Sequence, residues 1–210
     1  MRGGAGAEAE RFDGLTQLFH WLTAALVIGQ FATAWGRELA SDGHQAAALL
    51  TVHRSTGLLI WAVTMVRLVW RGRWGRRLPL PATMPALQRG LARANAWALY
   101  LLLAVQPLTG LAQELMRGKP FPLLIGHVPA VAARHRELVH LFHEIHEIGA
   151  WLLLALIGVH ALAALGHHFI LKDRVLVGML PKFPGAGGNK PATAAVPTDI
   201  NPATRTKDDA

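Results

Sequence analysis

The chain of 210 residues contains no cysteine. This absence excludes disulfide bonds, iron–sulfur clusters, thiolate zinc sites and covalently attached c-type haem, which all need cysteine sulfur. Charged residues are also scarce, at 16% against about a quarter in a typical soluble domain. Apolar residues make up 52%, so few polar groups remain to cover a globular surface, and lipid is the expected solvent for much of the chain.

Four long apolar stretches follow one another along the chain. They run over Leu15–Trp35, Leu49–Trp70, Leu91–Leu115 and Ile145–Leu171. Each has about 20 residues or more, which at about 1.5 Å per residue allows a helix to cross a hydrocarbon core of roughly 30 Å. No alternating strand pattern competes with them, and we find no internal repeat. The expected fold class is therefore all-α, as an integral membrane four-helix bundle.

The transmembrane domain is expected to cover residues 11–181. The tail, residues 182–210, is rich in Pro, Ala, Gly, Thr and Lys and has almost nothing to bury. Such a composition predicts disorder. Residues 1–10 are likewise expected to form a disordered N-terminal segment.

The distribution of arginines predicts the orientation in the membrane. The join Arg71–Arg89 contains five arginines and no acid, so the positive-inside rule makes it cytoplasmic, and both termini with it. The join Met116–His140, on the opposite side, fits the rule less well. It carries the basic residues Arg117, Lys119, Arg134 and Arg136. The net charge of the chain is +8, and many of its basic residues lie in the joins between apolar stretches. Lipid, and not nucleic acid, is therefore the expected partner.

Eleven histidines are unusual in so apolar a chain. Imidazole is the one strong metal ligand that this sequence has in quantity, and ionisable groups inside membrane helices are usually functional. Four histidines of the apolar stretches form the candidate ligand set: His20, His53, His146 and His160. His44, His127 and His135 are expected in solvated loops.

The spacing of His146 and His160 distinguishes one cofactor from two. Fourteen steps of 100° stop 40° short of four full turns, so both imidazoles share one helix face, about 21 Å apart along the axis. Two ligands of one metal cannot be so far apart, whereas ligands of two stacked cofactors can. With both termini inside, depth matches His20 with His160 near the inner face and His53 with His146 near the outer face.

Two bis-imidazole sites between facing helices predict two haem b groups. Such sites leave no open position on the iron, which favours electron transfer over oxygen chemistry at the metal. The alternatives are histidines hydrogen-bonded between helices, a zinc site and a proton relay. His143 competes with His146 for the outer site, but it lies about 60° off the face of His160.

Two other residues of the second stretch are candidates for contact with a cofactor. Arg67 lies 14 residues after His53 and so on the same helix face. Its guanidinium is suited to a propionate of the inner haem, and the alternative is an arginine that snorkels to the interface. Gly57, one turn from His53, allows a porphyrin to approach the backbone, although ordinary small-residue helix packing explains it about as well.

Motifs in all four stretches resemble the bacterial cytochrome b561 family. They are Arg11-Phe12 with His20-Trp21-Leu22, His53-Arg54-Ser55-Thr56-Gly57, Val66-Arg67-Leu68, Pro107-Leu108-Thr109-Gly110, and the run from Ile145-His146-Glu147 through Gly158-Val159-His160 to Met179-Leu180-Pro181. The resemblance covers about residues 11–181. It implies a four-helix inner-membrane dihaem cytochrome b whose ligands are the four histidines already paired by depth.

The resemblance also implies a function. Members of this family exchange electrons with membrane ubiquinone, and the best-understood ones resemble superoxide oxidases. The related Ni-hydrogenase-type cytochrome b subunits relay electrons from a partner enzyme instead. The hypotheses are therefore a superoxide:quinone oxidoreductase, an electron-relaying subunit of a dehydrogenase or hydrogenase, and a haem-free transporter or scaffold. The basic outer join suits either superoxide or an acidic periplasmic redox protein.

Overall fold

The computed structural model describes residues 11–75, 78, 84–172 and 175–180, so the expected disordered segments, residues 1–10 and 182–210, lie outside the described residues. Its helices are α1 (Gly14–Glu38), α2 (Gly43–Arg73), α3 (Ala86–Met116), α4 (Arg136–Phe169) and the short α5 (Val175–Met179). The first four are long and apolar enough to cross a membrane. The predicted all-α membrane bundle is confirmed, while the cytoplasmic position of both termini stays a prediction.

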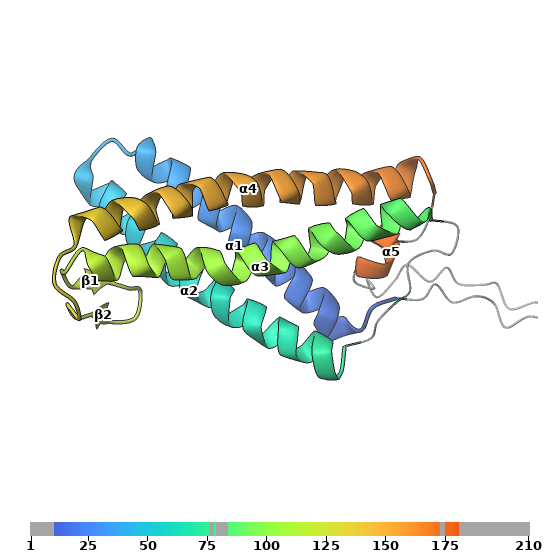
Figure 1. Ribbon diagram of the computed structural model, residues 1–210, viewed down its shortest axis with the longest axis horizontal. Coiled ribbons are helices and arrows are strands. Elements are labelled where there is room, and N and C mark those ends of the chain that lie inside the picture. The colour runs from blue at the N-terminus through green and yellow to red at the C-terminus, as the bar shows by residue number, and fades with distance from the viewer. Residues whose placement is uncertain (1–10, 76–77, 79–83, 173–174, 181–210) are drawn as a thin grey trace, which may run out of the picture.

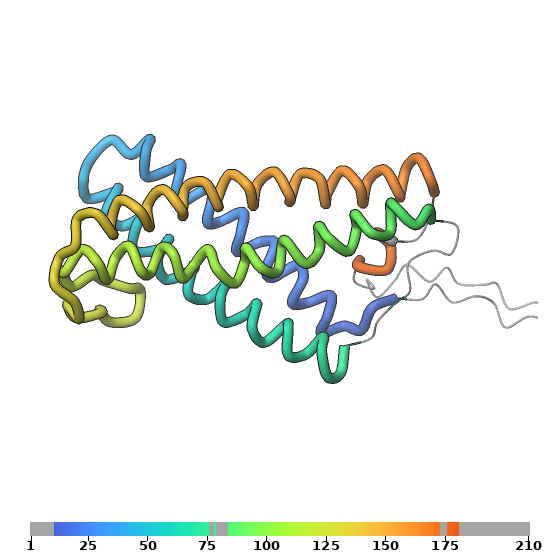
Figure 2. The backbone as a smooth tube through the Cα atoms, in the orientation of Figure 1, coloured from blue at the N-terminus to red at the C-terminus, as the bar shows by residue number. Residues whose placement is uncertain are grey.

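The long helices form two antiparallel hairpins, α1 with α2 and α3 with α4 (Figure 1). The backbone trace shows one hairpin crossing the other obliquely (Figure 2). We call the end that holds the connection between α1 and α2 the loop end, and the end where α1 begins and α5 lies the terminal end. The join between α3 and α4 is also at the loop end and contains a small antiparallel pair, β1 (Phe121–Pro122) and β2 (His127–Val128).

Local chemistry explains where the first two helices begin. The carboxylate of Asp13 accepts a hydrogen bond from the backbone N–H of Thr16 at 2.9 Å, and that of Asp42 accepts one from Gln45 at 2.7 Å. Aspartate is a preferred N-cap because it satisfies a backbone donor that the first turn leaves unpaired. The join after α3 turns at Gly118, whose φ of 67° favours glycine.

The fourth helix begins earlier than hydropathy predicts. It starts at Arg136, nine residues before the expected Ile145, because hydropathy marks the lipid-facing length of a helix and not its polar first turns. His140 and His143 therefore lie within α4. His44 lies in the first turn of α2 and His127 in β2, so neither is in a loop as expected, although both are exposed.

Few side chains are buried between the helices. Val27, Ile60 and Leu153 are among them, whereas the large apolar side chains of Ile28 and Leu162 are 70% and 71% exposed. A soluble protein seldom exposes so many large apolar side chains. On the membrane-spanning helices, these side chains form the surface that lipid covers.

The two described ends of the chain are joined at the terminal end. The backbone N–H of Phe12 and the side-chain amide of Gln17 both donate to the carbonyl of Gly178, at 3.2 and 3.0 Å. The indole N–H of Trp21 donates to the carbonyl of Met179 at 2.8 Å. The start of α1 and the segment α5 therefore close this end of the bundle together.

Candidate cofactor-binding sites

The four candidate histidines meet as two pairs. The rings of His20 on α1 and His160 on α4 have centres 6.1 Å apart, and those of His53 on α2 and His146 on α4 have centres 6.3 Å apart. The first pair is nearer the terminal end and the second nearer the loop end, and these are the partners expected from depth. We call them the terminal-end pair and the loop-end pair; their role as ligands stays a prediction.

The spacing within each pair suits a metal held between two imidazoles. A metal–nitrogen bond is about 2 Å long and the ring centre lies about 1 Å beyond the nitrogen, which gives ring centres about 6 Å apart. Both observed separations match this value. The described residues contain no group of three or more His, Asp or Glu that suits a bare metal ion, so the zinc alternative gains no support. The pairs fit the iron of a haem.

The imidazole of His53 is held by a threonine on the neighbouring helix α1. The Oγ1 of Thr33 lies 3.1 Å from His53 Nδ1, and the same hydroxyl donates to the backbone carbonyl of Gln30 at 2.9 Å. Because the hydroxyl proton is directed to that carbonyl, the oxygen accepts from Nδ1–H. The other ring nitrogen, Nε2, is then left with its lone pair, which is the form a metal ligand needs.

The imidazole of His146 is held in the same way by α3. The Oγ1 of Thr109 lies 3.0 Å from His146 Nδ1 and donates to the carbonyl of Gln106 at 2.7 Å. That carbonyl also lies 3.1 Å from His146 Nδ1, and the side-chain amide of Gln106 donates to the backbone carbonyl of His146. A carbonyl only accepts, so Nδ1 carries the proton here too.

The terminal-end pair has a different environment. Arg67 Nη2 lies 3.2 Å from His20 Nδ1, and the guanidinium also lies over the ring of Tyr100, 5.3 Å from its centroid. The Nε of Arg67 is buried without a hydrogen-bond partner. A guanidinium only donates, so this contact and ligation of iron through Nε2 of a neutral His20 exclude each other. With iron bound, Arg67 must find an acceptor, and a haem propionate is one.

Gly57 and Gly110 are among the glycines at which an added side chain would collide with a neighbour. A Cβ on Gly57, one of the predicted cofactor contacts, would come 2.9 Å from the side-chain amide of Gln30, so that the glycine admits this side chain between α1 and α2. The expected contact of Gly57 with a porphyrin stays a prediction. A Cβ on Gly110 would come 3.0 Å from Cε1 of His146, so Gly110 makes room for the imidazole itself.

The remaining histidines of α4 lie apart from both pairs. His143, the competitor of His146, is exposed and lies 3.8 Å from the carboxylate of Glu147. His167 is buried against α3, with its Nε2 3.2 Å from the side-chain amide of Gln88. The structure therefore brings His146, and not His143, to the ring of His53.

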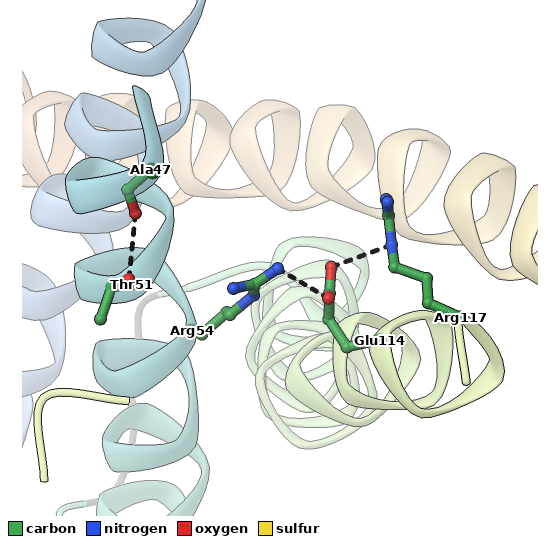
Figure 3. A network of polar contacts seen from close by, with 5 residues as sticks. All are labelled: Ala47, Thr51, Arg54, Glu114 and Arg117. Carbon is green, nitrogen blue, oxygen red and sulfur yellow. Dashed lines mark hydrogen bonds and ion pairs between the residues drawn. The ribbon is translucent and has the colours of Figure 1, made fainter. Parts of the chain in front are cut away.

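An ion-pair network connects α2 with α3 at the loop end (Figure 3). Glu114 is buried, with a carboxylate oxygen 2.7 Å from Arg54 Nη2 and the other oxygen 3.2 Å from Arg117 Nε. Arg54 follows His53 in the sequence, and Glu114 lies one turn after Gly110. This network is therefore adjacent to the loop-end pair on both helices.

A basic pocket opens at the loop end. Its volume is about 290 Å³. It is lined by Arg117, Lys119, Arg134, Arg136, Val139 and His140. Four of these side chains are permanently cationic at neutral pH, so the pocket is suited to anions. Arg117 belongs both to this pocket and to the network around Glu114.

The histidine pattern did not reveal the residues behind the loop-end imidazoles. Gln30 and Thr33, like Gln106 and Thr109, form a Gln-x-x-Thr motif in an apolar stretch. Polar residues at that spacing lie on one helix face, so the recurrence of the motif was the available signal. Only the pairing of helices shows that both motifs face a histidine.

Comparison with known proteins gives a consistent family. Residues 11–182 match the family model described as prokaryotic cytochrome b561. The chain is 36% identical over 178 residues to cytochrome b561 homolog 2 of Escherichia coli (strain K12), covering 82% of this chain and 93% of that protein. It is 31% identical over 166 residues to the probable superoxide oxidase CybB of Yersinia pestis, covering 79% and 93%. Cytochrome b561 homolog 1 of Escherichia coli (strain K12) is 31% identical over 169 residues, covering 80% and 96%.

Proposed function

The chain belongs to the prokaryotic cytochrome b561 family, and we propose that it is a dihaem b-type cytochrome that carries electrons across the membrane to a quinone. Membership of the family makes it a multi-pass protein of the bacterial inner membrane that binds haem b and takes part in electron transfer. The two haems, the quinone and the direction of transfer belong to the proposal.

The observation that carries the proposal is the pair of imidazole sites built on one helix. α4 contributes one histidine to each site, and the two are separated by 14 residues, about 21 Å along the axis. Each pair of imidazoles would hold one haem, and a bound haem would supply a reversible one-electron couple at its site. His146 and His160 thus hold two redox centres at different depths of one bundle, which suits transfer between the two faces.

The basic pocket supports superoxide as the electron donor. Superoxide is an anion, and a cluster of positive charge raises its local concentration and its rate of encounter. Each superoxide gives up one electron and becomes O2. Two such electrons, together with two protons, convert one quinone to quinol. A superoxide oxidase is also what the name of the Yersinia pestis relative describes.

A second candidate function is that of an electron-relaying subunit for a dehydrogenase or hydrogenase. The same join that lines the basic pocket exposes the apolar side chains of Leu124 and Ile125, which are 62% and 94% exposed. Apolar residues beside charged ones at the tip of a bundle suit a protein partner. This candidate predicts reduction by that partner and little by superoxide.

Haem content tests the two-site proposal. We expect the purified protein to contain two haem b per chain and to show a b-type band in the reduced-minus-oxidised spectrum. His20→Ala or His160→Ala should remove one haem and leave the other, and His53→Ala or His146→Ala should remove the second. His143→Ala is the matched control, since this side chain is exposed and should leave both haems bound. A wild-type protein without haem, or single variants that lose both haems, would contradict the proposal.

Rapid-mixing kinetics test the donor. Superoxide should reduce the purified protein at a rate that falls as ionic strength rises, because salt screens the attraction of the basic pocket. A variant with Arg134→Gln and Arg136→Gln should react more slowly and with a weaker salt dependence, with its haem content unchanged. A rate that is independent of salt, or no reaction, would favour the electron-relaying subunit.

A further inference from the structure

Both imidazoles of the loop-end pair rest on the same local motif. Gln30–Thr33 lies on α1 behind His53, and Gln106–Thr109 lies on α3 behind His146. In each case the threonine hydroxyl donates to the backbone carbonyl of the glutamine and lies 3.0–3.1 Å from Nδ1 of the histidine on the next helix. The two hairpins therefore present their loop-end histidines in equivalent ways, although the chain has no extended internal repeat.

This arrangement controls the electronic character of each ring. Nδ1–H has an oxygen acceptor, and a hydrogen bond from the outer nitrogen of a ligating histidine fixes its tautomer and raises the basicity of the other nitrogen. A more basic ligand favours the oxidised, more positively charged iron. The effect would act on both imidazoles of the loop-end site, because both rings have the same kind of partner.

Among the described contacts, neither imidazole of the terminal-end pair has a threonine hydroxyl as an acceptor for Nδ1–H. The group beside His20 is the guanidinium of Arg67, a cation that only donates, so it cannot act as an acceptor behind Nδ1 when the ring binds iron, and no hydrogen bond of the His160 ring is described. A positive charge near a redox centre favours its reduced form. The two sites are therefore biased in opposite directions by the protein.

We propose that Thr33 and Thr109 are positioning residues that hold the loop-end imidazoles with Nδ1–H engaged and make this site the lower-potential one of the two. This inference rests on the proposed function, since it presumes a haem at each pair. It adds a direction to that function. An electron delivered at the loop end moves to a site of higher potential at the terminal end.

The test is a redox titration of the purified holoprotein, followed in the visible spectrum, for Thr33→Val, Thr109→Val and the double variant. Valine keeps the shape of threonine and removes the hydroxyl. We expect the lower-potential component to move upward in each single variant and further in the double variant. The expected change is about tenfold in the ratio of oxidised to reduced haem at a fixed potential, which is about 59 mV for a one-electron couple. The higher-potential component should not move.

Three controls separate positioning from simple disruption. Thr33→Ser and Thr109→Ser keep the hydroxyl and should keep the wild-type potential. Thr51→Val removes a hydroxyl of α2 that donates to the backbone carbonyl of Ala47 (Figure 3), and it should shift neither component. His53→Ala identifies the loop-end component as the one that disappears.

The outcomes distinguish this inference from the proposed function. A protein that binds fewer than two haems would contradict the proposed function before any threonine is changed. A protein with two haems in which the valine variants move neither component, move both equally, or move the higher-potential one would overturn the role of the threonines alone. A His53→Ala variant that loses the higher-potential component would overturn the predicted order of the two sites.

Discussion

Glu114 is the buried negative charge of a three-residue network, and Glu114→Gln is a sharp test of how the two hairpins are held together. In the native chain its carboxylate faces two guanidinium groups, at 2.7 Å from Arg54 and 3.2 Å from Arg117, which leaves a net charge of +1 in the network. Glutamine keeps the shape of the side chain and raises this charge to +2. The two arginines then repel each other across the interface between α2 and α3.

The side chains of Arg54 and Glu114 are only 16% and 11% exposed, so water does little to solvate a charge left unpaired. Removing one partner of a buried ion pair costs about 3–5 kcal/mol. For a chain of this size about 1 kcal/mol corresponds to about 2–4 °C in Tm. The expected loss is therefore about 6–20 °C, with Arg54→Met giving a similar loss.

The assay is thermal unfolding in detergent, followed by the helical circular dichroism signal. Arg54→Met combined with Glu114→Leu removes both buried charges and should cost much less than the sum of the single variants, because apolar residues often replace a buried pair at little cost. Glu147→Gln is the matched control. Its carboxylate is 61% exposed and 3.8 Å from His143, so the change should stay within about 1 kcal/mol. Single variants that lose less than about 1 kcal/mol, or a double variant equal to the sum, would refute this account.

Two further predictions concern the histidine pairs. Gly110→Ala should destabilise the folded protein by about 1–3 kcal/mol and lower the haem content of the loop-end site, since its Cβ would press on the His146 ring. Gly90→Ala is the control: its Cβ meets no neighbour, so the change should be neutral or stabilising by up to about 1 kcal/mol. Equal thermal unfolding and haem content in the two variants would contradict this prediction. Arg67→Gln should lower the reduction potential of the terminal-end haem in a redox titration, because a buried cation is lost. Arg67→Lys retains the positive charge and should leave the potential close to the wild-type value. An unchanged potential in Arg67→Gln would exclude this electrostatic role of Arg67.

The sequence predicted the helices well where hydropathy is the deciding signal. Three of the four apolar stretches lie wholly within long helices, and the fourth ends two residues beyond α4, at Leu171. A span of about 20 apolar residues in lipid forms a helix because it must satisfy its backbone hydrogen bonds internally. The start of α4 at Arg136 was missed because polar residues outside the lipid do not interrupt a helix. The two-residue strands β1 and β2 were also missed, because strands so short have no periodic pattern to detect.

The partners of the histidines could be predicted from helix geometry and depth, but their surroundings could not. The third helix has no histidine, and the sequence assigned it no part in either site. In the structure α3 supplies Thr109 and Gln106 to the His146 ring, room at Gly110, and the carboxylate of Glu114 to Arg54. These contacts depend on which faces of two helices meet, and a hydropathy pattern does not specify that.

The sequence by itself determined how many times the chain can cross a membrane and which side chains can bind a metal. The first follows from the length of each apolar run against the thickness of the hydrocarbon core, and the second from a composition with eleven histidines and no cysteine. Only the tertiary structure decided what lies behind each ring. A hydroxyl at 3.0 Å from His146 and a guanidinium at 3.2 Å from His20 give similar imidazoles opposite environments, because hydrogen bonds and charges act over distances that the fold alone sets.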